Sequence, residues 1–154
     1  MSPAATGYLL HSISALLLLT APCSYARETA ETKHPVDARV DALVEKAVST
    51  ADLIQAYDKG IALWDAELNR VYQALRKALP ASAAEKLKPA QQQWLLYRDA
   101  QCAMLDEQYN QYDGTLYLPM GVAARMRVTE DRARYLTQLL EIQQEHSGPD
   151  MTEK

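Results

Sequence analysis

The sequence predicts an all-α fold, a small antiparallel helical bundle of three long helices preceded by a short N-terminal helix. Glycine (5) and proline (7) are few among 154 residues and 48% of the residues are apolar, which argues against disorder and against a strand-rich fold with many tight turns. Apolar side chains recur at the three- and four-residue spacing of a helix face. This length suits a single domain with one core.

Two helices are expected in the first half of the chain. Residues 36–47 place their apolar side chains on one face of a short helix. From about residue 50 to residue 79 an unbroken apolar stripe indicates a long helix; its members are Leu53, Tyr57, Ile61, Trp64, Leu68, Val71, Leu75 and Leu79. Pro80 ends this helix because proline has no amide hydrogen and clashes with the preceding turn.

Two more helices are expected in the second half. Ser82 and Glu85 form a capping-box pair that predicts the start of a third helix, which extends to about residue 111. Asp113-Gly114-Thr115 is the clearest turn signal in the chain. The fourth helix begins near Pro119 and presents one mainly apolar face, formed by Val122, Met126, Thr129, Ala133, Leu136 and Leu140.

The first 26 residues are typical of an export signal. The apolar run at residues 13–19 is too short to span a bilayer, and small residues at Ser24 and Ala26 predict cleavage that leaves Arg27 as the first residue. Lipidation at Cys23 is the less favoured alternative, because Pro22 occupies a position where such signals need a small, flexible residue. The protein is therefore expected in the periplasm or secreted, without a stable membrane anchor.

These boundaries divide the chain into four parts. They are a signal peptide (1–26), a flexible lead-in (27–35), a helical domain (36–145) and a flexible tail (146–154). Removal of the signal peptide leaves Cys102 as the single cysteine. An exported protein with one cysteine either buries the thiol or uses it in a covalent dimer, and the sequence favours the buried thiol in a monomer or weak dimer.

Charge and residue content exclude several classes of function. The formal net charge is −4, whereas nucleic-acid binding needs a basic surface. Beyond the signal peptide the histidines are His34 and His146, both expected near the ends of the domain. The sequence contains no Ser-His-Asp order, metal-ligand spacing or glycine-rich phosphate loop, so we expect a binding protein that is not an enzyme and has no cofactor or metal.

The third predicted helix places polar residues on its apolar face. Gln91 and Arg98 lie at helical spacing with Trp94 and Cys102. On the second helix Asp65, Asn69 and Tyr72 form a row beside the apolar stripe. If the two helices pack as an antiparallel hairpin, Asp65 or Asn69 can reach Arg98, whose guanidinium needs an acceptor when it is buried.

These residues carry a resemblance to a known family, the LprI-like lysozyme inhibitors. The segments that resemble its pattern are Asp65-Ala66-Glu67-Leu68-Asn69 with Tyr72, Gln91 to Trp94 with Arg98, Asp99 and Cys102, and Thr129 with Arg132 and Leu136. The resemblance spans about residues 50–140 and implies a helical envelope domain and, for some members, inhibition of lysozyme. Further family cysteines correspond by spacing to positions near Ala56 and Ala124, so the resemblance also implies that the family disulfides are absent here.

Two interpretations of the motif residues remain open. Asp65, Asn69, Gln91, Trp94 and Arg98 either form a hydrogen-bonded lock between helices, which their inward spacing favours, or a recognition surface. The best surface candidate combines acidic residues with tyrosine and consists of Asp106, Glu107, Tyr109, Tyr112, Asp113 and Tyr117. The alternative for that segment is an ordinary solvated loop.

The functional prediction is an exported envelope binding protein that inhibits lysozyme by protein–protein contact. Animal lysozymes are generally basic, so an acidic, tyrosine-rich segment suits them as partners. The alternative is a structural or stress-related periplasmic helical protein with a different partner.

Overall fold

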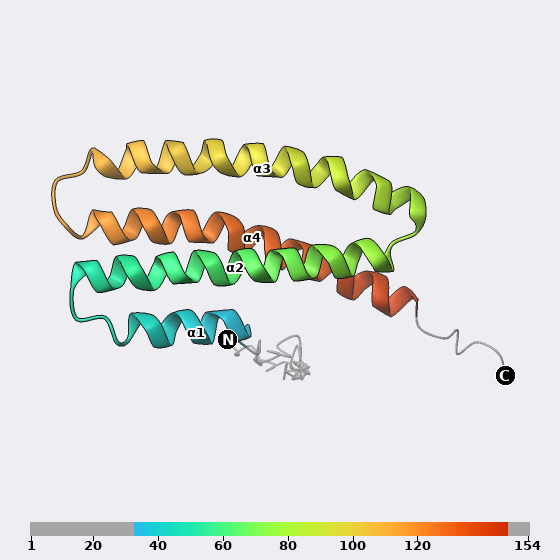
Figure 1. Ribbon diagram of the computed structural model, residues 1–154, viewed down its shortest axis with the longest axis horizontal. Helices are drawn as coiled ribbons and strands as arrows, with labels where there is room; N and C mark the ends of the chain where they lie inside the picture. The colour runs from blue at the N-terminus through green and yellow to red at the C-terminus, as the bar shows by residue number, and fades with distance from the viewer. Residues whose placement is uncertain (1–32, 148–154) are drawn as a thin grey trace, which may run out of the picture. The chain divides into compact units, whose positions relative to one another are not determined.

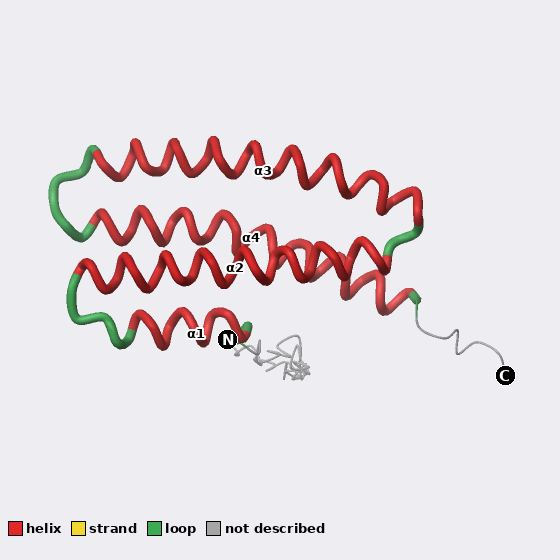
Figure 2. Tube along the Cα trace, in the orientation of Figure 1, coloured by secondary structure: helices red, strands yellow, loops and turns green. Residues whose placement is uncertain are grey.

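The computed structural model describes residues 33–147 and confirms the all-α fold. Its helices are α1 (Pro35–Val44), α2 (Thr50–Ala78), α3 (Ala81–Asn110) and α4 (Tyr117–His146), joined by short connections (Figures 1 and 2). Successive helices run in opposite directions, so α2 and α4 run parallel to each other (Figure 1). The predicted signal peptide, Cys23 and residues 148–154 of the predicted tail lie outside the described residues.

Local capping fixes the start of α2. The Ser49 hydroxyl accepts a hydrogen bond from the Asp52 amide at 3.1 Å and donates one to the Asp52 carboxylate at 2.7 Å. The hydrogen bond from Ser49, followed by one from the Val48 amide, lowers the pKa of Asp52. At the other end Pro80 follows the cap residue Leu79, so the predicted end of this helix is confirmed.

The predicted capping box at the start of α3 is wrong. The helix begins at Ala81 with Pro80 in the cap position, and no side chain caps its amides. The Pro80 carbonyl instead accepts the amides of Ala83 at 3.0 Å and Ala84 at 2.9 Å. Ser82 therefore lies inside the first turn, two residues past the cap position.

The helix α1 begins earlier than the sequence predicted, and α4 extends further at both ends. His34 caps α1 by accepting the Val36 amide on Nδ1 at 3.2 Å, and Pro35 is the first helical residue. Proline fits this position because its fixed φ suits a first turn and its missing amide hydrogen is not needed there. The helix α4 begins at Tyr117, two residues before the predicted start, and ends at His146, which the sequence assigned to the tail.

The core lies where α2 and α4 pack against each other, with α1 adding one side. Trp64, Val71, Leu75 and Leu136 are the largest fully buried side chains. The α2–α4 contact is the most extensive in the bundle, α1 packs on α2, and α3 packs mainly on α4. Every residue of the predicted α4 face except Val122 is buried, including Thr129 at 3% exposure.

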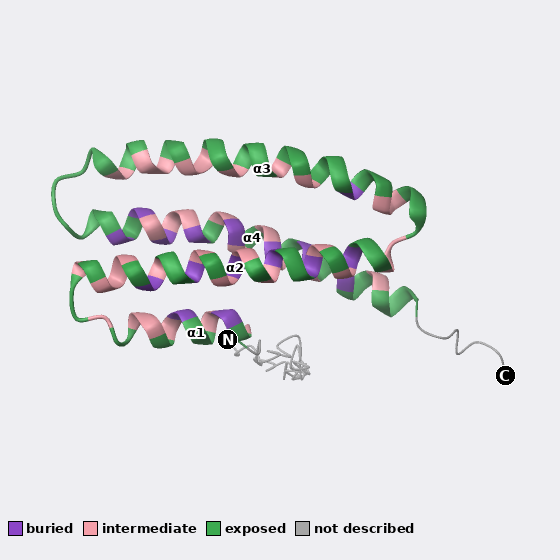
Figure 3. Cartoon of the chain, viewed as in Figure 1, coloured by how far each residue is buried: buried purple, intermediate pink, exposed green. Residues whose placement is uncertain are grey.

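The third helix is the least buried of the long helices. Leu87 is its one buried residue, and exposed side chains cover most of its length (Figure 3). The sequence is compatible with α2 and α3 packing as an antiparallel hairpin. They do not form this pair, because α3 makes few contacts with α2. The inward face of α3 carries Gln91 and Arg98, whose burial against the apolar stripe of α2 would be costly, whereas α4 offers that stripe an apolar face. In the described part of the chain, no helix has the length and apolarity needed to cross a membrane.

Candidate functional site

A polar clamp joins α3 to α4 at the centre of the motif residues. The Arg132 guanidinium on α4 donates from Nε at 3.1 Å and from Nη2 at 3.0 Å to the Gln91 side-chain oxygen on α3. Gln91 therefore satisfies two donors of a cation that has no carboxylate within 4.0 Å among residues 33–147. Burial lowers the pKa of Arg132 because it disfavours the charged form.

The Trp94 ring lies close to two guanidiniums. The Arg98 Cζ atom is 5.6 Å from the ring centroid and the Arg132 Cζ atom is 5.7 Å from it. Arg132 also lies over the Tyr135 ring, at 5.7 Å. Such cation–π contacts supply part of the stabilisation that a half-buried cation loses when it leaves water. The clamp thus consists of Gln91, Trp94, Arg98 and Arg132.

The expected contact between Asp65 and Arg98 is present but shared. Arg98 Nη1 lies 3.6 Å from the Asp65 carboxylate, while Nε and Nη2 donate to Asp99 at 3.0 and 2.8 Å. Asn69 does not reach Arg98, since its amide nitrogen donates to Asp65 at 3.3 Å. The Asp65 side chain is 48% exposed, so this ion pair adds little to stability.

The other motif residues do not join the hydrogen bonds of the clamp. Thr129 is buried in α4, and Tyr72 is half-buried against the core. Cys102 is half-buried on α3, with Arg98 and Arg125 among the charges that act on it. The structure therefore brings Asp65, Gln91, Trp94, Arg98 and Arg132 into one contact network and leaves Tyr72, Cys102 and Thr129 outside it.

The Cys102 thiol is expected to react slowly in the native protein. Burial raises its pKa, and the two guanidiniums only partly oppose that rise, so little thiolate is present at neutral pH. A thiol reagent should label native protein several-fold more slowly than protein unfolded in urea. Equal rates in the two states, or a dimer that a reducing agent dissolves, would contradict a shielded thiol.

Three tyrosines gather where α3 turns into α4. The rings of Tyr109 and Tyr112 meet edge to face with centroids 6.0 Å apart, and those of Tyr112 and Tyr117 are 4.9 Å apart. Gly114 makes this possible, because its φ of +116° allows a sharp reversal that residues with a Cβ rarely adopt. We call the acidic and tyrosine residues from Asp106 to Tyr117, which the sequence indicates as a candidate partner contact, the predicted contact set. Its exposed members are Tyr112, Tyr117, Glu107 and Asp113.

Two members of the predicted contact set are structural instead of freely exposed. Asp106 forms an ion pair with Arg125 at 3.1 Å, and Arg125 also lies 3.9 Å from Asp58. Tyr109 is half-buried against α4, where a Cβ added to Gly121 would lie 3.0 Å from the Tyr109 Cβ. Both residues therefore hold α3 to α4 at this end of the bundle.

Sequence reasoning missed the apolar part of this surface. Leu116, Leu118 and Met120 are 64%, 45% and 43% exposed beside the tyrosines. The signal was present, since the run from Leu116 to Met120 is apolar at nearly every position and a helix there cannot bury all of them. We call the exposed residues Glu107, Tyr112, Asp113, Leu116, Tyr117, Leu118 and Met120 the turn surface.

The fold and the clamp define a small all-α domain whose long helices are tied together by an arginine–tryptophan–glutamine contact. The chain belongs to the lysozyme inhibitor LprI family, whose model matches residues 44–136 and so includes the clamp and the turn surface. The chain is also similar to an uncharacterized protein of Rhizobium meliloti, with 35% identity over 106 residues that cover 60% of this chain and 68% of the relative. No solved structure matches.

Proposed function

We propose that this protein is exported to the cell envelope and inhibits lysozyme by direct protein–protein contact. Its membership of a lysozyme inhibitor family supports an inhibitory role. The observation that carries the proposal is the turn surface, where exposed tyrosine, leucine and methionine side chains lie beside acidic residues. Aromatic residues and methionine are enriched in protein interfaces, whereas a freely solvated loop has no need of them.

Charge supports a basic partner for the turn surface. Glu107 and Asp113 are exposed, and neither forms an ion pair within the described range. The whole chain carries a formal charge of −4. Opposite charges accelerate encounter with a cationic protein, and apolar contacts then slow dissociation. A basic animal-type lysozyme fits both requirements.

The location of the protein is part of the proposal. A signal peptide over residues 1–26, cleaved after Ala26, would release the helical domain (36–145) and its tail (146–154) into the periplasm or the medium, where it can meet a lysozyme. Cleavage at this site also removes Cys23, the residue that a lipid anchor would use. The residue that begins the exported protein is therefore Arg27.

The test is an enzyme assay with protein purified from the envelope fraction of cells that express the full sequence. Its intact mass should correspond to a chain that starts at Arg27, and a mass that includes Cys23 and a lipid would overturn the proposed cleavage after Ala26. The protein should slow the lysis of cell-wall substrate by a basic animal lysozyme. This inhibition should weaken as salt rises, because ions screen charges over about 8 Å at physiological ionic strength.

The outcome that overturns the proposal is full lysozyme activity in the presence of excess, correctly folded protein. Helix content measured by circular dichroism confirms the folding in that experiment. Such a result would favour the alternative of a structural or stress-related envelope protein with another partner. Inhibition that is insensitive to salt would support the function but show that charge does not steer the encounter with lysozyme.

A further inference from the structure

A groove of about 550 Å³ lies between α1 and α2, away from the clamp and the turn surface. Its floor is apolar and consists of Ala42 and Leu43 from α1 and Ala62 and Leu63 from α2. Ala42 and Ala62 are exposed and Leu43 and Leu63 are half-buried, so the groove is open to solvent. The volume falls within the range of about 300–1,000 Å³ that is usual for small-molecule sites.

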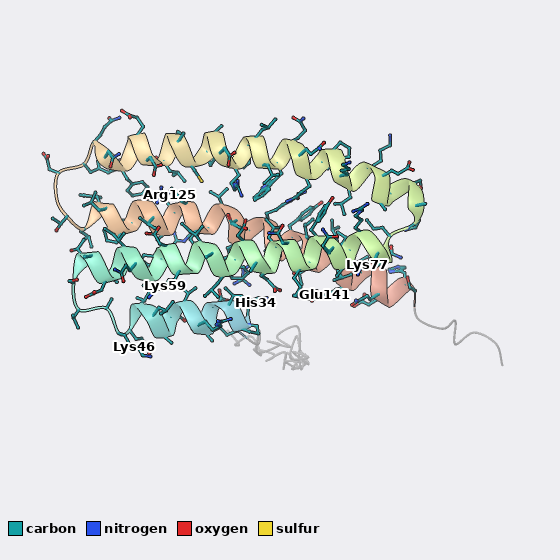
Figure 4. All side chains as sticks on the ribbon, viewed as in Figure 1. His34, Lys46, Lys59, Lys77, Arg125 and Glu141 are labelled. Atoms are coloured by element: carbon teal, nitrogen blue, oxygen red, sulfur yellow. The ribbon has the colours of Figure 1, made fainter. Side chains whose placement is uncertain are left out.

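Three cations surround this apolar floor. Arg39 lies on α1, Lys46 lies in the turn after α1, and Lys59 lies on α2. Figure 4 shows Lys46 and Lys59 near the same end of these helices. None of the three is within 4.0 Å of a carboxylate in the described chain, although the domain is acidic overall. The groove therefore combines positive charge at its rim with an apolar interior.

None of the residues that line the groove is acidic. Asp41 on α1 is paired with Lys33. A smaller hollow of about 220 Å³ shares Lys46 and Lys59 with the groove and continues toward Asp52. The Asp52 carboxylate already accepts hydrogen bonds from Ser49 and Val48, so it is held at the far end. Arg39, Lys46 and Lys59 are consequently the charged groups that an anionic head would meet at the rim.

We propose that this groove binds a free anionic amphiphile, a molecule with one alkyl chain and a carboxylate or phosphate head. The alkyl chain lies on the alanine and leucine floor, and the head lies against the cationic rim. Each methylene that leaves water strengthens binding about fourfold, and the head adds charge-assisted hydrogen bonds to Arg39 and the lysines. This inference is independent of lysozyme inhibition, because it uses neither the clamp nor the turn surface.

The first test uses sodium dodecanoate, below its micelle concentration, in titration calorimetry with the purified exported protein. Dodecanoate should bind in about one copy per chain, octanoate should bind at least about tenfold more weakly, and dodecanol should also bind more weakly because it lacks the charge. The double variant Lys46→Glu/Lys59→Glu should reduce dodecanoate affinity at least about tenfold.

A matched control separates the groove from the net charge. The double variant Lys77→Glu/Lys86→Glu changes the charge equally at exposed residues outside the groove; Lys77 lies near the other end of α2 (Figure 4). It should bind dodecanoate as the parent does. Ala62→Trp should fill the floor and abolish binding, whereas Ala100→Trp, at an exposed position of α3, should not.

Three results would overturn the proposal. They are no dodecanoate binding by the folded parent protein, equal losses in the two charge-reversed variants, and equal binding of dodecanoate to the Ala62→Trp variant. Sedimentation with anionic phospholipid vesicles distinguishes the source of the ligand. Vesicle binding that depends on Lys46 and Lys59, without binding of free dodecanoate, would make the groove a membrane-contact face instead. Lysozyme inhibition should be the same in the Lys46→Glu/Lys59→Glu variant and in its control.

Discussion

Trp64→Ala is expected to lower the free energy of unfolding by about 3–5 kcal/mol, the largest effect of any single truncation in the core. Trp64 is 1% exposed in α2 and contacts the other two core helices. The His34 ring stacks on it at a centroid distance of 4.8 Å, and Arg134 of α4 lies over it at 4.9 Å. Arg134 also donates to Asp37 of α1 at 2.6 Å, so the tryptophan helps to hold α1 to both long helices.

Urea unfolding followed by circular dichroism measures this loss, and two variants calibrate it. Leu96→Ala removes an apolar side chain that is 65% exposed and should change stability by less than about 0.5 kcal/mol. Trp64→Phe should cost well under half of the alanine variant, because it keeps most of the buried area and removes an indole N–H that has no hydrogen-bond partner. A Trp64→Ala protein as stable as Leu96→Ala would contradict the assigned core.

Arg132→Ala is expected to cost about 2 kcal/mol and to loosen α3 selectively. The substitution removes both hydrogen bonds to Gln91 and one of the two cations on Trp94. Because α3 contributes only Leu87 to the buried core, the clamp is a large share of what holds it. Amide hydrogen exchange should therefore speed up along α3 while α2 keeps its protection.

The matched control is Arg127→Ala on the same helix. Arg127 is exposed and makes no ion pair or side-chain hydrogen bond within residues 33–147, so its loss should stay within about 0.5 kcal/mol. Equal costs for the two variants, or exchange that quickens uniformly over the whole bundle, would show that the clamp does not secure α3. The stability costs test how much the clamp stabilises the protein, and the exchange pattern tests whether that stabilisation acts on α3.

Much of the fold follows from periodicity in the sequence. The α2 stripe from Leu53 to Leu79 predicts a long amphipathic helix, and Pro80 and Gly114 mark the turns because their backbone requirements are local. Which helix packs against that stripe could not be predicted, because the sequence does not distinguish one apolar helix face from another as its partner. The capping box was predicted wrongly because the helix begins earlier than Ser82, with Pro80 in the cap position.

The candidate site was predicted as a set of residues but not as a set of contacts. Helical spacing places Gln91, Trp94 and Arg98 on one face of α3, as the structure shows. It does not indicate that Arg132 would bond to Gln91 across 41 residues, because such pairs depend on which helices become neighbours. The same reason explains why Asp106 pairs with Arg125 instead of remaining free for a partner.

The structure also improves the choice of variants for the turn surface. Substituting Asp106 or Tyr109 would weaken the α3–α4 contact, so a loss of inhibition there would not identify the interface. Glu107 and Asp113 are exposed and can be reversed with less risk to the fold. Glu85 and Glu141 supply a control with the same change in charge, because both are exposed and lie toward the opposite end of the bundle from the turn (Figure 4 labels Glu141).

The most direct test of the proposed function is the association rate of a basic animal lysozyme with these two double variants, measured at low salt on immobilised protein. Glu107→Lys/Asp113→Lys should lower the association rate about tenfold, whereas Glu85→Lys/Glu141→Lys should lower it much less, because steering is strongest for charges next to the contact. Inhibition should fall in the same order. Identical rates and identical inhibition for the two variants would contradict the turn surface as the place where lysozyme binds.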